Sequence, residues 1–452
     1  MRVSQSDYYG EGGGGDFTGK KGCYSVAQRP SPPNNKNLAS SVIFPVTGNV
    51  YPDGYFHVTL SIGQPPKPYS VDIDTGSDIT WLQCDAPCTK CIPAPHTPYK
   101  PRKNLVACED PLCVSIQPSN YECESQDQCD YEIEYADSGS SMGVLVQDVF
   151  SLKFTNGSIS APRLAFGCGY HQEVPDSIHM PYTDGVLGLG TGKSSILYQL
   201  HNSGVIRNVV GHCLSVHGGG FLFFGDNLIP SSGIVWVPLS SSASEKYYSL
   251  GSADLLYGGQ ATALKGLSII FDSGSTYSYL NSQAYLALVS LLKKDLNVKQ
   301  LRDAADDKTL PICWKGPKPF KSISDVKSLF KPLQLVFKNA ENISFQLNPE
   351  AYLIVTKEGN VCLGILNGSE VGLGDVNLIG DISLQDKLVI YDNEKQRIGW
   401  APANCNRLPK ADRDFNGGYY QPYEANIDTL FETCPAYDYK EKRKASKELR
   451  LL

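Results

Sequence analysis

Two short acidic motifs in this chain contain the residue types of an acid–base site. Asp74-Thr-Gly-Ser77 follows an apolar run that includes Ile73, and Asp272-Ser-Gly-Ser275 follows a second apolar run 198 residues later. Two carboxyl groups a few ångströms apart cannot both ionise at low cost, so they share one proton and titrate as a pair. One group then acts as a base while the other acts as an acid, which suits activation of water and protonation of a carbonyl.

The other residues of the two motifs fit this chemistry. The glycine of each motif permits the tight turn that lets the carboxyl groups approach. We expect the hydroxyl after each Asp to donate to the opposite loop and the final serine to donate to an outer carboxylate oxygen. These supporting residues are Thr75, Gly76, Ser77, Ser273, Gly274 and Ser275. The chemistry requires no metal ion, no cofactor and no separate nucleophile. A single Asp-Thr-Gly is commonly a turn or a helix cap, but two matched copies favour the acid pair.

The sequence around both motifs predicts strands. Short runs of Val, Ile, Phe and Tyr are broken by Gly, Pro and Asn, as in residues 55–62 and 69–73. Each acidic motif is also followed, after a comparable interval, by an apolar-apolar-Gly triplet, Val186–Gly188 or Leu378–Gly380. A repeat this long indicates two lobes of similar fold, with the acidic turns meeting at their interface.

These patterns predict a mostly β, bilobal fold with two pseudo-symmetric lobes and a central cleft. We expect a flexible N-terminal tail at 1–40, an N-terminal lobe at 41–240 with a cysteine-rich insert, a C-terminal lobe at 241–405 and a polar extension at 406–452. The best helical pattern covers 282–296, where leucines mark one face after a Ser282 cap. Gly218–Gly220 predicts a hairpin.

Composition narrows the class of protein. The 452 residues are 41% hydrophobic, which is ample for a core. The net charge is −7, which gives no electrostatic reason to expect nucleic acid as a partner. No run of 18 apolar residues is present, so we expect no membrane span.

The 14 cysteines favour an oxidising compartment. Seven of them lie between Cys84 and Cys129, and we favour structural disulfides over a zinc site because Cys88-x2-Cys91 lacks a second pair of that spacing. The N-terminus conflicts with export, since Met1–Ser6 leads into polar sequence without the apolar region of a signal peptide. Either the signal is missing from this version of the chain or export uses another route, and we favour the first.

Two other motifs are poorer candidates for chemistry. Gly190-Thr-Gly-Lys-Ser194 resembles a phosphate-binding loop, but Leu187 stands where that motif needs its first glycine, so a turn behind the catalytic strand is the better interpretation. His212 and Cys213 are adjacent, so on a strand they would point to opposite faces rather than form a nucleophilic pair.

With these residues in place, the chain resembles the pepsin-family aspartic proteases over roughly residues 50 to 405. Trp81-Leu-Gln-Cys84-Asp-Ala-Pro-Cys88 and Phe166-Gly-Cys168-Gly are similar to the plant atypical members, nucellin-like ones above all. The resemblance implies that Asp74 and Asp272 are the catalytic pair. It also implies that Tyr135 is the flap tyrosine that closes over the substrate and that Trp81 hydrogen-bonds it.

The resemblance further implies disulfides between Cys168 and Cys213 and between Cys313 and Cys362. Because the cysteine cluster is odd in number, one of its members could pair with Cys405. Nothing in the core demands Cys23 or Cys434.

The implied function is an endopeptidase that holds an extended peptide under the flap and cleaves it in acid. A peptide or protein would be its partner, and we expect a monomer that is secreted, extracellular or vacuolar. The sequons at Asn156, Asn342 and Asn367 are glycosylation sites if the chain enters the secretory route. A protein of the same fold that works as a binder or inhibitor is the alternative, although such relatives typically lack a catalytic Asp or the flap Tyr.

Overall fold

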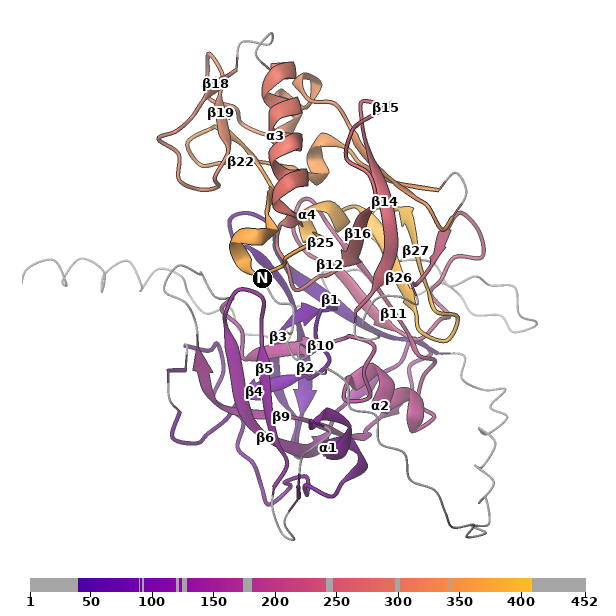
Figure 1. Ribbon diagram of the computed structural model, residues 1–452. Coiled ribbons are helices and arrows are strands. Elements are labelled where there is room, and N and C mark those ends of the chain that lie inside the picture. The colour runs from indigo at the N-terminus through magenta and orange to yellow at the C-terminus, as the bar shows by residue number, and fades with distance from the viewer. Residues whose placement is uncertain are drawn as a thin grey trace, which may run out of the picture. The chain divides into compact units, whose positions relative to one another are not determined.

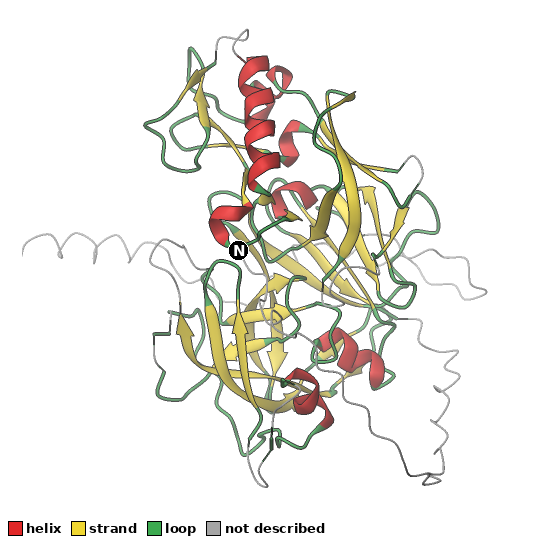
Figure 2. Ribbon diagram, in the orientation of Figure 1, coloured by secondary structure: helices red, strands yellow, loops and turns green. Residues whose placement is uncertain are grey.

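The computed structural model describes residues 40–408, apart from 89, 92, 119–121, 124–127, 174–180, 241–246, 297–300 and 341–342. Residues 1–39 and 409–452, which hold nearly all of the two predicted tails, lie outside the described residues. Strands dominate the described part of the chain (Figures 1 and 2), as the sequence predicts.

Thirteen of the described strands form one sheet. Their spatial order is β13 (Val235–Pro238), β27 (Arg397–Pro402), β26 (Lys387–Asp392), β11 (Val209–Leu214), β12 (Gly220–Phe224), β1 (Val42–Asn49), β2 (Tyr55–Ile62), β3 (Lys67–Asp74), β10 (Gly185–Gly188), β4 (Trp81–Gln83), β9 (Arg163–Glu173), β6 (Ser140–Val149) and β5 (Asp130–Glu134).

Strand β1 joins two groups of strands in this sheet, because its first half pairs with β12 and its second half pairs with β2. At the other side of β12, β11 pairs with β26, which lies late in the chain. The sheet therefore contains strands from both predicted lobes, and the boundary at 240 stays a prediction.

A second sheet of eight strands lies wholly in the later half of the chain. Along it run β21 (Ser344–Leu347), β20 (Leu333–Phe337), β14 (Ser249–Tyr257), β16 (Leu267–Phe271), β25 (Val376–Ile379), β17 (Ser278–Leu280) and β24 (Ile365–Asn367), with β15 (Gln260–Ala261) paired to β14. Two small sheets complete the described strands. One has four strands in the order β18 (Arg302–Asp303), β19 (Cys313–Lys315), β23 (Val361–Leu363) and β22 (Leu353–Val355). The other is the pair of β7 (Leu152–Lys153) and β8 (Ile159–Ser160).

The two large sheets contain the same local arrangement twice. β3 lies parallel to β10, which is antiparallel to β4, and β4 lies parallel to β9. In the later half, β16 lies parallel to β25, which is antiparallel to β17, and β17 lies parallel to β24. This repetition agrees with the two lobes of similar fold that the acidic repeat predicts.

Helices are few and short, except one. The described helices are α1 (Pro111–Ile116), α2 (Ile196–Asn202), α3 (Ser282–Leu296) and α4 (Asp381–Leu384), with 3-10 turns η1 (Ile323–Asp325), η2 (Lys327–Leu329), η3 (Pro349–Ala351) and η4 (Gly368–Val371). α3 has the predicted bounds, and Ala284, Leu288, Leu292 and Leu296 on one face are buried. The predicted cap at Ser282 is wrong by one residue, because the Asn281 side chain accepts the Ala284 N–H at 2.9 Å.

The predicted hairpin at Gly218–Gly220 is confirmed. It joins β11 to β12, and all three glycines have positive φ, which other residues adopt only with strain. The apolar faces of the strands pack into one large core cluster that includes Val71 and Ile73 of β3 and Phe271 of β16. Both acidic loops therefore start from buried strands.

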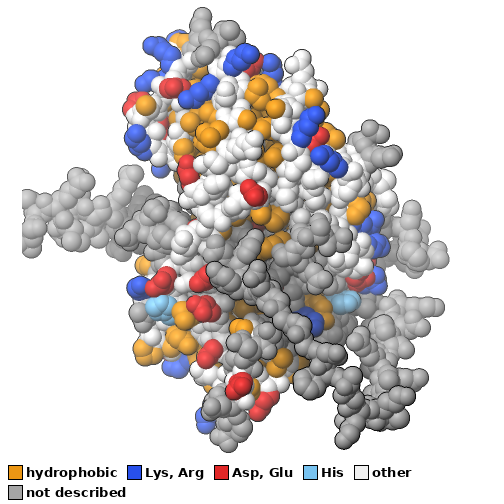
Figure 3. Space-filling view, viewed as in Figure 1, with side chains coloured by type: hydrophobic (Ala, Val, Ile, Leu, Met, Phe, Trp, Pro, Cys, Tyr) orange, Lys and Arg blue, Asp and Glu red, His pale blue; other side chains and the backbone are white. Residues whose placement is uncertain are grey.

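Charged side chains of both signs are scattered over the face shown in Figure 3, with Lys and Arg most frequent near α3 and β18. Lysines of the later half of the chain pair with carboxylates, as Lys331 does with Asp295 at 2.7 Å and Lys327 with Glu350 at 2.9 Å. This pairing offsets the positive charge of that part of the surface.

Candidate active site

Asp74 ends strand β3, and backbone hydrogen bonds fix its position. Gly188 of β10 lies opposite it in the parallel register, and the Leu189 N–H donates to the Asp74 carbonyl at 2.8 Å. A side chain on Gly188 would collide with the backbone of Asp78, so only glycine permits this close approach. The Asp74 side chain is 0% exposed.

Asp272 repeats this arrangement after β16. Phe271 lies opposite Ile379 of β25, and the Asp272 N–H donates to the Ile379 carbonyl at 3.0 Å. Its side chain is also 0% exposed. The two acidic residues thus occupy the same position in two similar pairs of parallel strands.

The two acidic loops are joined directly by hydrogen bonds. The Ser273 N–H donates to the Thr75 Oγ1 at 2.9 Å, and the Thr75 N–H donates to the Ser273 Oγ at 3.2 Å. The Ser273 hydroxyl in turn donates to the Ile73 carbonyl at 3.0 Å. Because all these groups are buried, the bonds hold the loops at a fixed separation.

Each carboxyl group is oriented by its own loop. The hydroxyl of Ser77 donates to Asp74 Oδ2 at 2.6 Å, and the hydroxyl of Ser275 donates to Asp272 Oδ2 at 2.7 Å. The N–H of the glycine in each motif donates to the other oxygen, Oδ1, at 2.8 Å for Asp74 and 2.9 Å for Asp272. Both carboxyl groups therefore have the same pair of donors, which sets the plane of each.

The inner oxygens of the two carboxyl groups lie close together. A side-chain carbon built on Gly274 would collide with Asp74 Oδ1 and would lie 3.2 Å from Asp272 Oδ1. Both oxygens therefore border the same small space. Burial and the charge of Asp74 raise the pKa of Asp272, against the opposing effect of its two donors. A raised pKa on one of two neighbouring carboxyl groups is what sharing of one proton predicts.

The residues predicted to form the flap lie beside the first loop. Tyr135 directly follows β5 in the β5–β6 hairpin, and Trp81 begins β4, where it pairs with Val186 of β10. The Trp81 Nε1–H donates to the Tyr135 hydroxyl at 2.7 Å. The structure therefore contains the Trp–Tyr contact that the resemblance implies.

The tip of this hairpin also contacts the later half of the chain. Ala136 is buried in an apolar cluster with Tyr279 of β17, Leu378 of β25 and Leu373. The sequence does not reveal this contact, because a single alanine in a turn carries no pattern. It keeps the hairpin tip against β17 and β25.

Two further buried acids lie next to the acidic loops and were not predicted as site residues. Asp72 is on β3, two positions before Asp74, and Asp381 follows Gly380 of the second apolar-apolar-Gly triplet. They are 3% and 1% exposed. The signal for Asp72 was present in the sequence, because residues two apart on a strand share one face.

A buried histidine and tyrosine lie near the first loop. His212 Nε2 lies 3.1 Å from the hydroxyl of Tyr391, which also interacts with the Thr75 side chain. Burial lowers the pKa of His212 to about 3. His212 is therefore a neutral residue next to the loop contacts, and Cys213 is in a disulfide, so the two do not form a nucleophilic pair.

The segment after β10 contacts the first loop from behind. The Gly190 N–H donates to the Ser77 carbonyl and the Gly192 N–H to Asp78 Oδ1, each at 2.8 Å. Residues 190–194 therefore form a turn behind the first acidic loop, as the sequence predicts, rather than a phosphate-binding loop.

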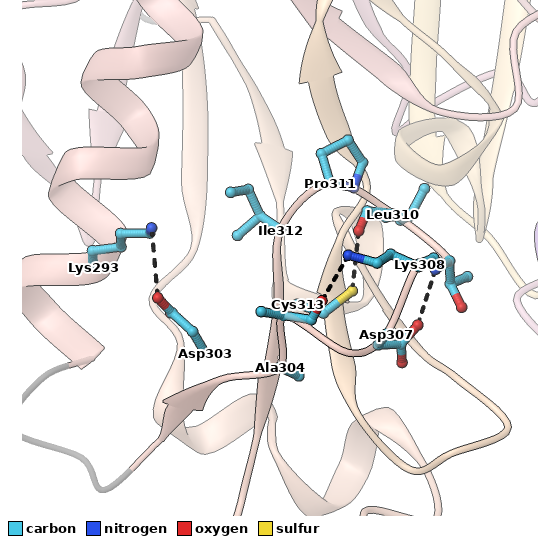
Figure 4. A pocket seen from close by; sticks show the side chains of 11 residues that line it. Lys293, Asp303, Ala304, Asp307, Lys308, Leu310, Pro311, Ile312 and Cys313 are labelled. Carbon is cyan, nitrogen blue, oxygen red and sulfur yellow. Dashed lines mark hydrogen bonds and ion pairs between the residues drawn. The ribbon is translucent and has the colours of Figure 1, made fainter.

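A pocket of about 420 Å³ lies elsewhere, between α3 and the loop before β19 (Figure 4). Its walls include the Lys293–Asp303 ion pair, and Lys308 Nζ there donates to the Ala305 carbonyl at 2.8 Å. None of the residues of the acidic loops lines it. In the described part of the chain, Asp307, Cys313 and Cys362 form a group with the spacing of metal ligands, but both sulfurs are in a disulfide and cannot ligate as thiolates.

Six disulfides join described cysteines. Within the cysteine-rich insert, Cys88 pairs with Cys91, Cys108 with Cys123 and Cys113 with Cys129, which favours disulfides over the zinc alternative. The predicted bond between Cys313 and Cys362 is present, across neighbouring strands β19 and β23. Cys23 and Cys434 lie outside the described residues.

The predicted bond between Cys168 and Cys213 is wrong. Cys168 pairs with Cys84 and Cys213 pairs with Cys405, so Cys405 does not pair with the cysteine cluster either. The reason is strand order. Six strands separate β9, which carries Cys168, from β11, which carries Cys213, whereas β9 lies beside β4, which ends just before Cys84.

The predicted glycosylation sites differ in accessibility. Asn156 is exposed in the β7–β8 turn, where its Oδ1 accepts from Ser158. Asn367 is partly buried, and its Nδ2 donates to Glu370 at 2.9 Å. Asn342 lies outside the described residues. Glycosylation of each stays a prediction.

Across the residues that the structure describes, no helix is both long and apolar enough to cross a membrane.

Comparison with known families gives two matches that together cover most of the chain. The model described as "Xylanase inhibitor N-terminal" matches residues 56–226, and that described as "Xylanase inhibitor C-terminal" matches residues 257–402. Each match contains one of the two acidic motifs.

Named relatives and solved structures agree with this. An aspartic proteinase of Oryza sativa subsp. japonica is 45% identical over 390 residues, which cover 83% of this chain and 93% of that protein. Aspartic proteinase 36 of Arabidopsis thaliana is 29% identical over 435 residues, or 91% of this chain and 87% of that protein.

Two solved structures share the fold at low sequence identity. Basic 7S globulin from soybean has a TM-score of 0.63 at 18% identity, covering 84% of this chain and 100% of that one. An aspartic proteinase from Irpex lacteus has a TM-score of 0.57 at 20% identity. The match covers 81% of this chain and 98% of that one.

Proposed function

Because the chain belongs to the plant branch of the pepsin-like aspartic proteinases, we propose that it is an active aspartic endopeptidase in which Asp74 and Asp272 hydrolyse peptide bonds in acid. The observation that carries the proposal is the space that Asp74 Oδ1 and Asp272 Oδ1 both border, between loops joined by the Thr75 and Ser273 bonds. That space is where one water molecule could contact both carboxyl groups.

The reaction follows from the state of the pair. With one proton shared, the ionised carboxyl removes a proton from the water, and the protonated carboxyl donates to the carbonyl oxygen of the peptide. The water oxygen bonds to the carbonyl carbon, and the tetrahedral intermediate then breaks its C–N bond as a proton passes to the leaving nitrogen. No acyl-enzyme forms, because the nucleophile is water and not a side chain.

The donors in the two loops support this chemistry. Ser77 and Ser275 donate to the outer oxygens, while the inner oxygens accept the glycine N–H groups and border the space between the two loops, where water and substrate would exchange protons with them. The raised pKa of Asp272 means that the pair keeps its proton in acid and loses it as the pH rises. Activity should therefore be greatest at acid pH.

The partner in this proposal is an extended peptide or protein chain, bound under the flap that carries Tyr135. The reaction needs no cofactor. We further propose a monomer that works in a secreted or vacuolar compartment, which the six disulfides support because they persist where thiols are oxidised.

A binding or inhibitory protein without peptidase activity is the second candidate function. It is favoured by the description of the matching family models, which names a xylanase inhibitor, and by the fold shared with basic 7S globulin from soybean. Against it stand both carboxyl groups, their donors and the Trp81–Tyr135 bond, all of which an inhibitor could lose without cost to binding.

Cleavage of a peptide library by the purified protein between pH 3 and 7 tests the proposal. We expect acid cleavage that pepstatin inhibits and that Asp74→Asn and Asp272→Asn each reduce by at least about a thousandfold, because either change removes the shared acid–base pair. Asp392→Asn is the matched control. Asp392 is as buried as Asp72 but pairs with Arg397 outside both loops, so this variant should keep its activity.

Substantial cleavage by either loop variant would contradict the assignment of the pair. A folded wild-type protein that cleaves no peptide at any pH, yet binds and inhibits a glycanase, would establish the second candidate instead.

A further inference from the structure

The flap hairpin ends in a tight turn that is largely buried. Residues 135–139 join β5 to β6, and we call them the flap tip. The Tyr135 N–H donates to the Gly139 carbonyl and the Gly139 N–H donates to Asp137 Oδ1, each at 2.8 Å. Ala136 is 5% exposed and Asp137 is 9% exposed, although the turn of a hairpin is ordinarily open to water. Another part of the protein therefore covers the flap tip.

The covering surface is one face of the second sheet. Ala136 lies in an apolar cluster with Tyr279 of β17 and Leu378 of β25, which are opposite one another in the two strands. The residues that follow them, Leu280 and Ile379, belong instead to the main core cluster. Because side chains alternate along a strand, one face of β17 and β25 turns to the core and the other to the flap tip.

Asp272 extends from the same face as these two residues. In the parallel register, Ile270 of β16 lies beside Leu378, and Phe271 lies beside Ile379. Phe271 packs in the main core cluster, so Ile270 points to the side of the flap tip. The Asp272 N–H still bonds to the Ile379 carbonyl, which extends the alternation to Asp272. The proposed catalytic acid therefore adjoins the apolar surface under the flap tip.

Tyr279 occupies the space between that acid and the flap tip. The residue is 7% exposed, so its ring leaves water little access to this space. Burial raises the pKa of Tyr279, and Tyr277, Asp137 and Asp272 raise it further. The hydroxyl group of Tyr279 is therefore close enough to interact electrostatically with both the flap tip and the second acidic loop.

We propose that Tyr279 determines specificity, because its ring limits the pocket beside Asp272 to a small substrate side chain such as that of glycine or alanine. This inference rests on the proposed peptidase function and names a substrate class for it. Tyr279 is not a catalytic residue here, since its role is to occupy space.

The physical reason is the alternation of side chains in an extended peptide. A peptide bound under the flap turns every second side chain toward the second sheet. The side chain nearest Asp272 then meets Tyr279 and Leu378, which already pack against Ala136. A close-packed cluster accepts additional atoms only when its members move, which is costly. Glycine or alanine needs little movement, whereas leucine or phenylalanine would have to displace the ring of Tyr279 or lift the flap tip.

The cleavage profile of a peptide library measures this preference. In the wild-type protein we expect one substrate position close to the cleaved bond to favour glycine or alanine over leucine by about tenfold or more in kcat/KM, since a single excess methylene in a fitted pocket has that effect. Tyr279→Ala should remove the preference at that position, because the space left by the ring accepts leucine and phenylalanine. Preferences at the neighbouring positions, whose side chains point the other way, should not change.

Two control variants separate the size of the pocket from other effects. Tyr279→Phe removes the hydroxyl but keeps the ring, so the preference should stay. Tyr285→Ala removes a ring of the same 7% exposure from α3, where it packs in the main core cluster. This variant should lose stability without any change in preference. Where Tyr279→Ala fails to fold, Tyr279→Val leaves a smaller cavity and is subject to the same outcomes.

Binding of uncleavable peptides tests the pocket without catalysis. In these analogues a hydroxyethylene group replaces the cleaved bond, and glycine, alanine or leucine is placed at each position in turn. Calorimetric titration of wild type and Tyr279→Ala gives a Kd for each analogue. At one position we expect wild type to bind the glycine or alanine analogue about tenfold more tightly than the leucine analogue, and Tyr279→Ala to lose this difference.

A preference for small side chains that persists in folded Tyr279→Ala would overturn the proposal and leave the peptidase function intact. A wild-type protein that accepts leucine as well as alanine at every position near the cleaved bond would overturn it too. If wild type cleaves nothing but binds the analogues with the expected preference, the peptidase function fails and the pocket assignment is supported. If it neither cleaves nor binds them, both fail.

Discussion

Around Asp74 and Asp272 the same hydrogen bonds recur, but the residues just outside the two loops differ. Two positions before the aspartate, the first loop has Asp72 and the second has Ile270. After the apolar-apolar-Gly triplet, the first half of the chain has Leu189 and the second has Asp381. Each loop thus has one extra buried acid nearby, at positions that the repeat does not relate. The repeat fixes the geometry of the pair, and these unmatched residues distinguish its two members.

The surroundings of the two acidic loops also differ in other respects. The first loop has the Trp81–Tyr135 contact beside it, and Thr75 has a buried tyrosine and histidine near it. The hydroxyl of Ser273 instead donates to a backbone carbonyl. Substitutions in and around each acidic loop therefore measure whether the two loops contribute equally to activity.

Gly274→Ala should have the largest effect. A Cβ at this position would collide with Asp74 Oδ1, so the substitution in the second loop should displace the carboxyl group of the first. We expect kcat/KM for peptide cleavage to fall by at least about a hundredfold, since a displacement near 1 Å at a reacting group has that effect. Gly157→Ala is the control, because a Cβ there meets nothing within 4 Å; it should lower stability but not activity.

Ser77→Ala and Ser275→Ala compare the outer donors. A hydroxyl that donates to an ionised carboxylate contributes about twice as much as one that donates to a neutral acid. On the hypothesis that Asp272 is the member that holds the shared proton, Ser77→Ala should reduce kcat about tenfold and Ser275→Ala several times less. Equal losses in steady-state assays would show that neither aspartate holds the proton preferentially.

Tyr135→Phe tests the Trp81–Tyr135 contact, which lies beside the first loop. It removes the hydroxyl that accepts from Trp81 and keeps the ring, so we expect a several-fold fall in kcat/KM with the fold intact. Trp81→Phe removes the same bond from the other side. In a double-mutant cycle the two losses should not add, and additive losses would mean that the bond itself is unimportant.

His212→Gln should change stability in acid more than activity. Burial lowers the pKa of His212 from 6.5 to about 3, so as the pH falls from 6.5 the unfolded chain binds a proton that the folded protein does not. The histidine therefore costs stability in acid, on the order of 3 kcal/mol at pH 4, and costs none above pH 6.5.

Thermal unfolding of wild type and His212→Gln at pH 4 and pH 7 checks this. The variant should gain stability relative to wild type on going from pH 7 to pH 4, although it loses a contact with Tyr391 at both. A stability difference that is the same at both pH values would contradict the assigned neutral state.

The features that could be predicted from sequence are those determined by residues that lie close together in the chain. Each acidic loop, with its Asp, hydroxyl and glycine, is a local pattern, and its repetition in the chain revealed the pairing. The α3 helix was predicted because its leucines recur with helical spacing, and the Gly218–Gly220 hairpin because only glycine tolerates its backbone angles.

The features that the sequence did not predict depend on which strands become neighbours in the folded protein. The partner of Cys168 follows from β9 lying beside β4. The partner of Cys213 follows from β11 lying beside β26, whose neighbour β27 leads to Cys405; no spacing of cysteines reveals this order. Asp381 is a similar case, because its N–H meets the Ser275 carbonyl only once residues about a hundred apart in the chain become neighbours. The contact of Ala136 with Tyr279 likewise joins residues far apart in the chain.

The pairing of β26 with β11 also bears on how this protein is made. β11 is complete at Leu214, but its partner does not begin until Lys387, and the bond from Cys213 must wait for Cys405. During synthesis the early half therefore leaves the ribosome with one edge of its sheet unpaired, and it stays exposed until the final strands emerge. Folding cannot be finished lobe by lobe; it is completed from the far end of the chain.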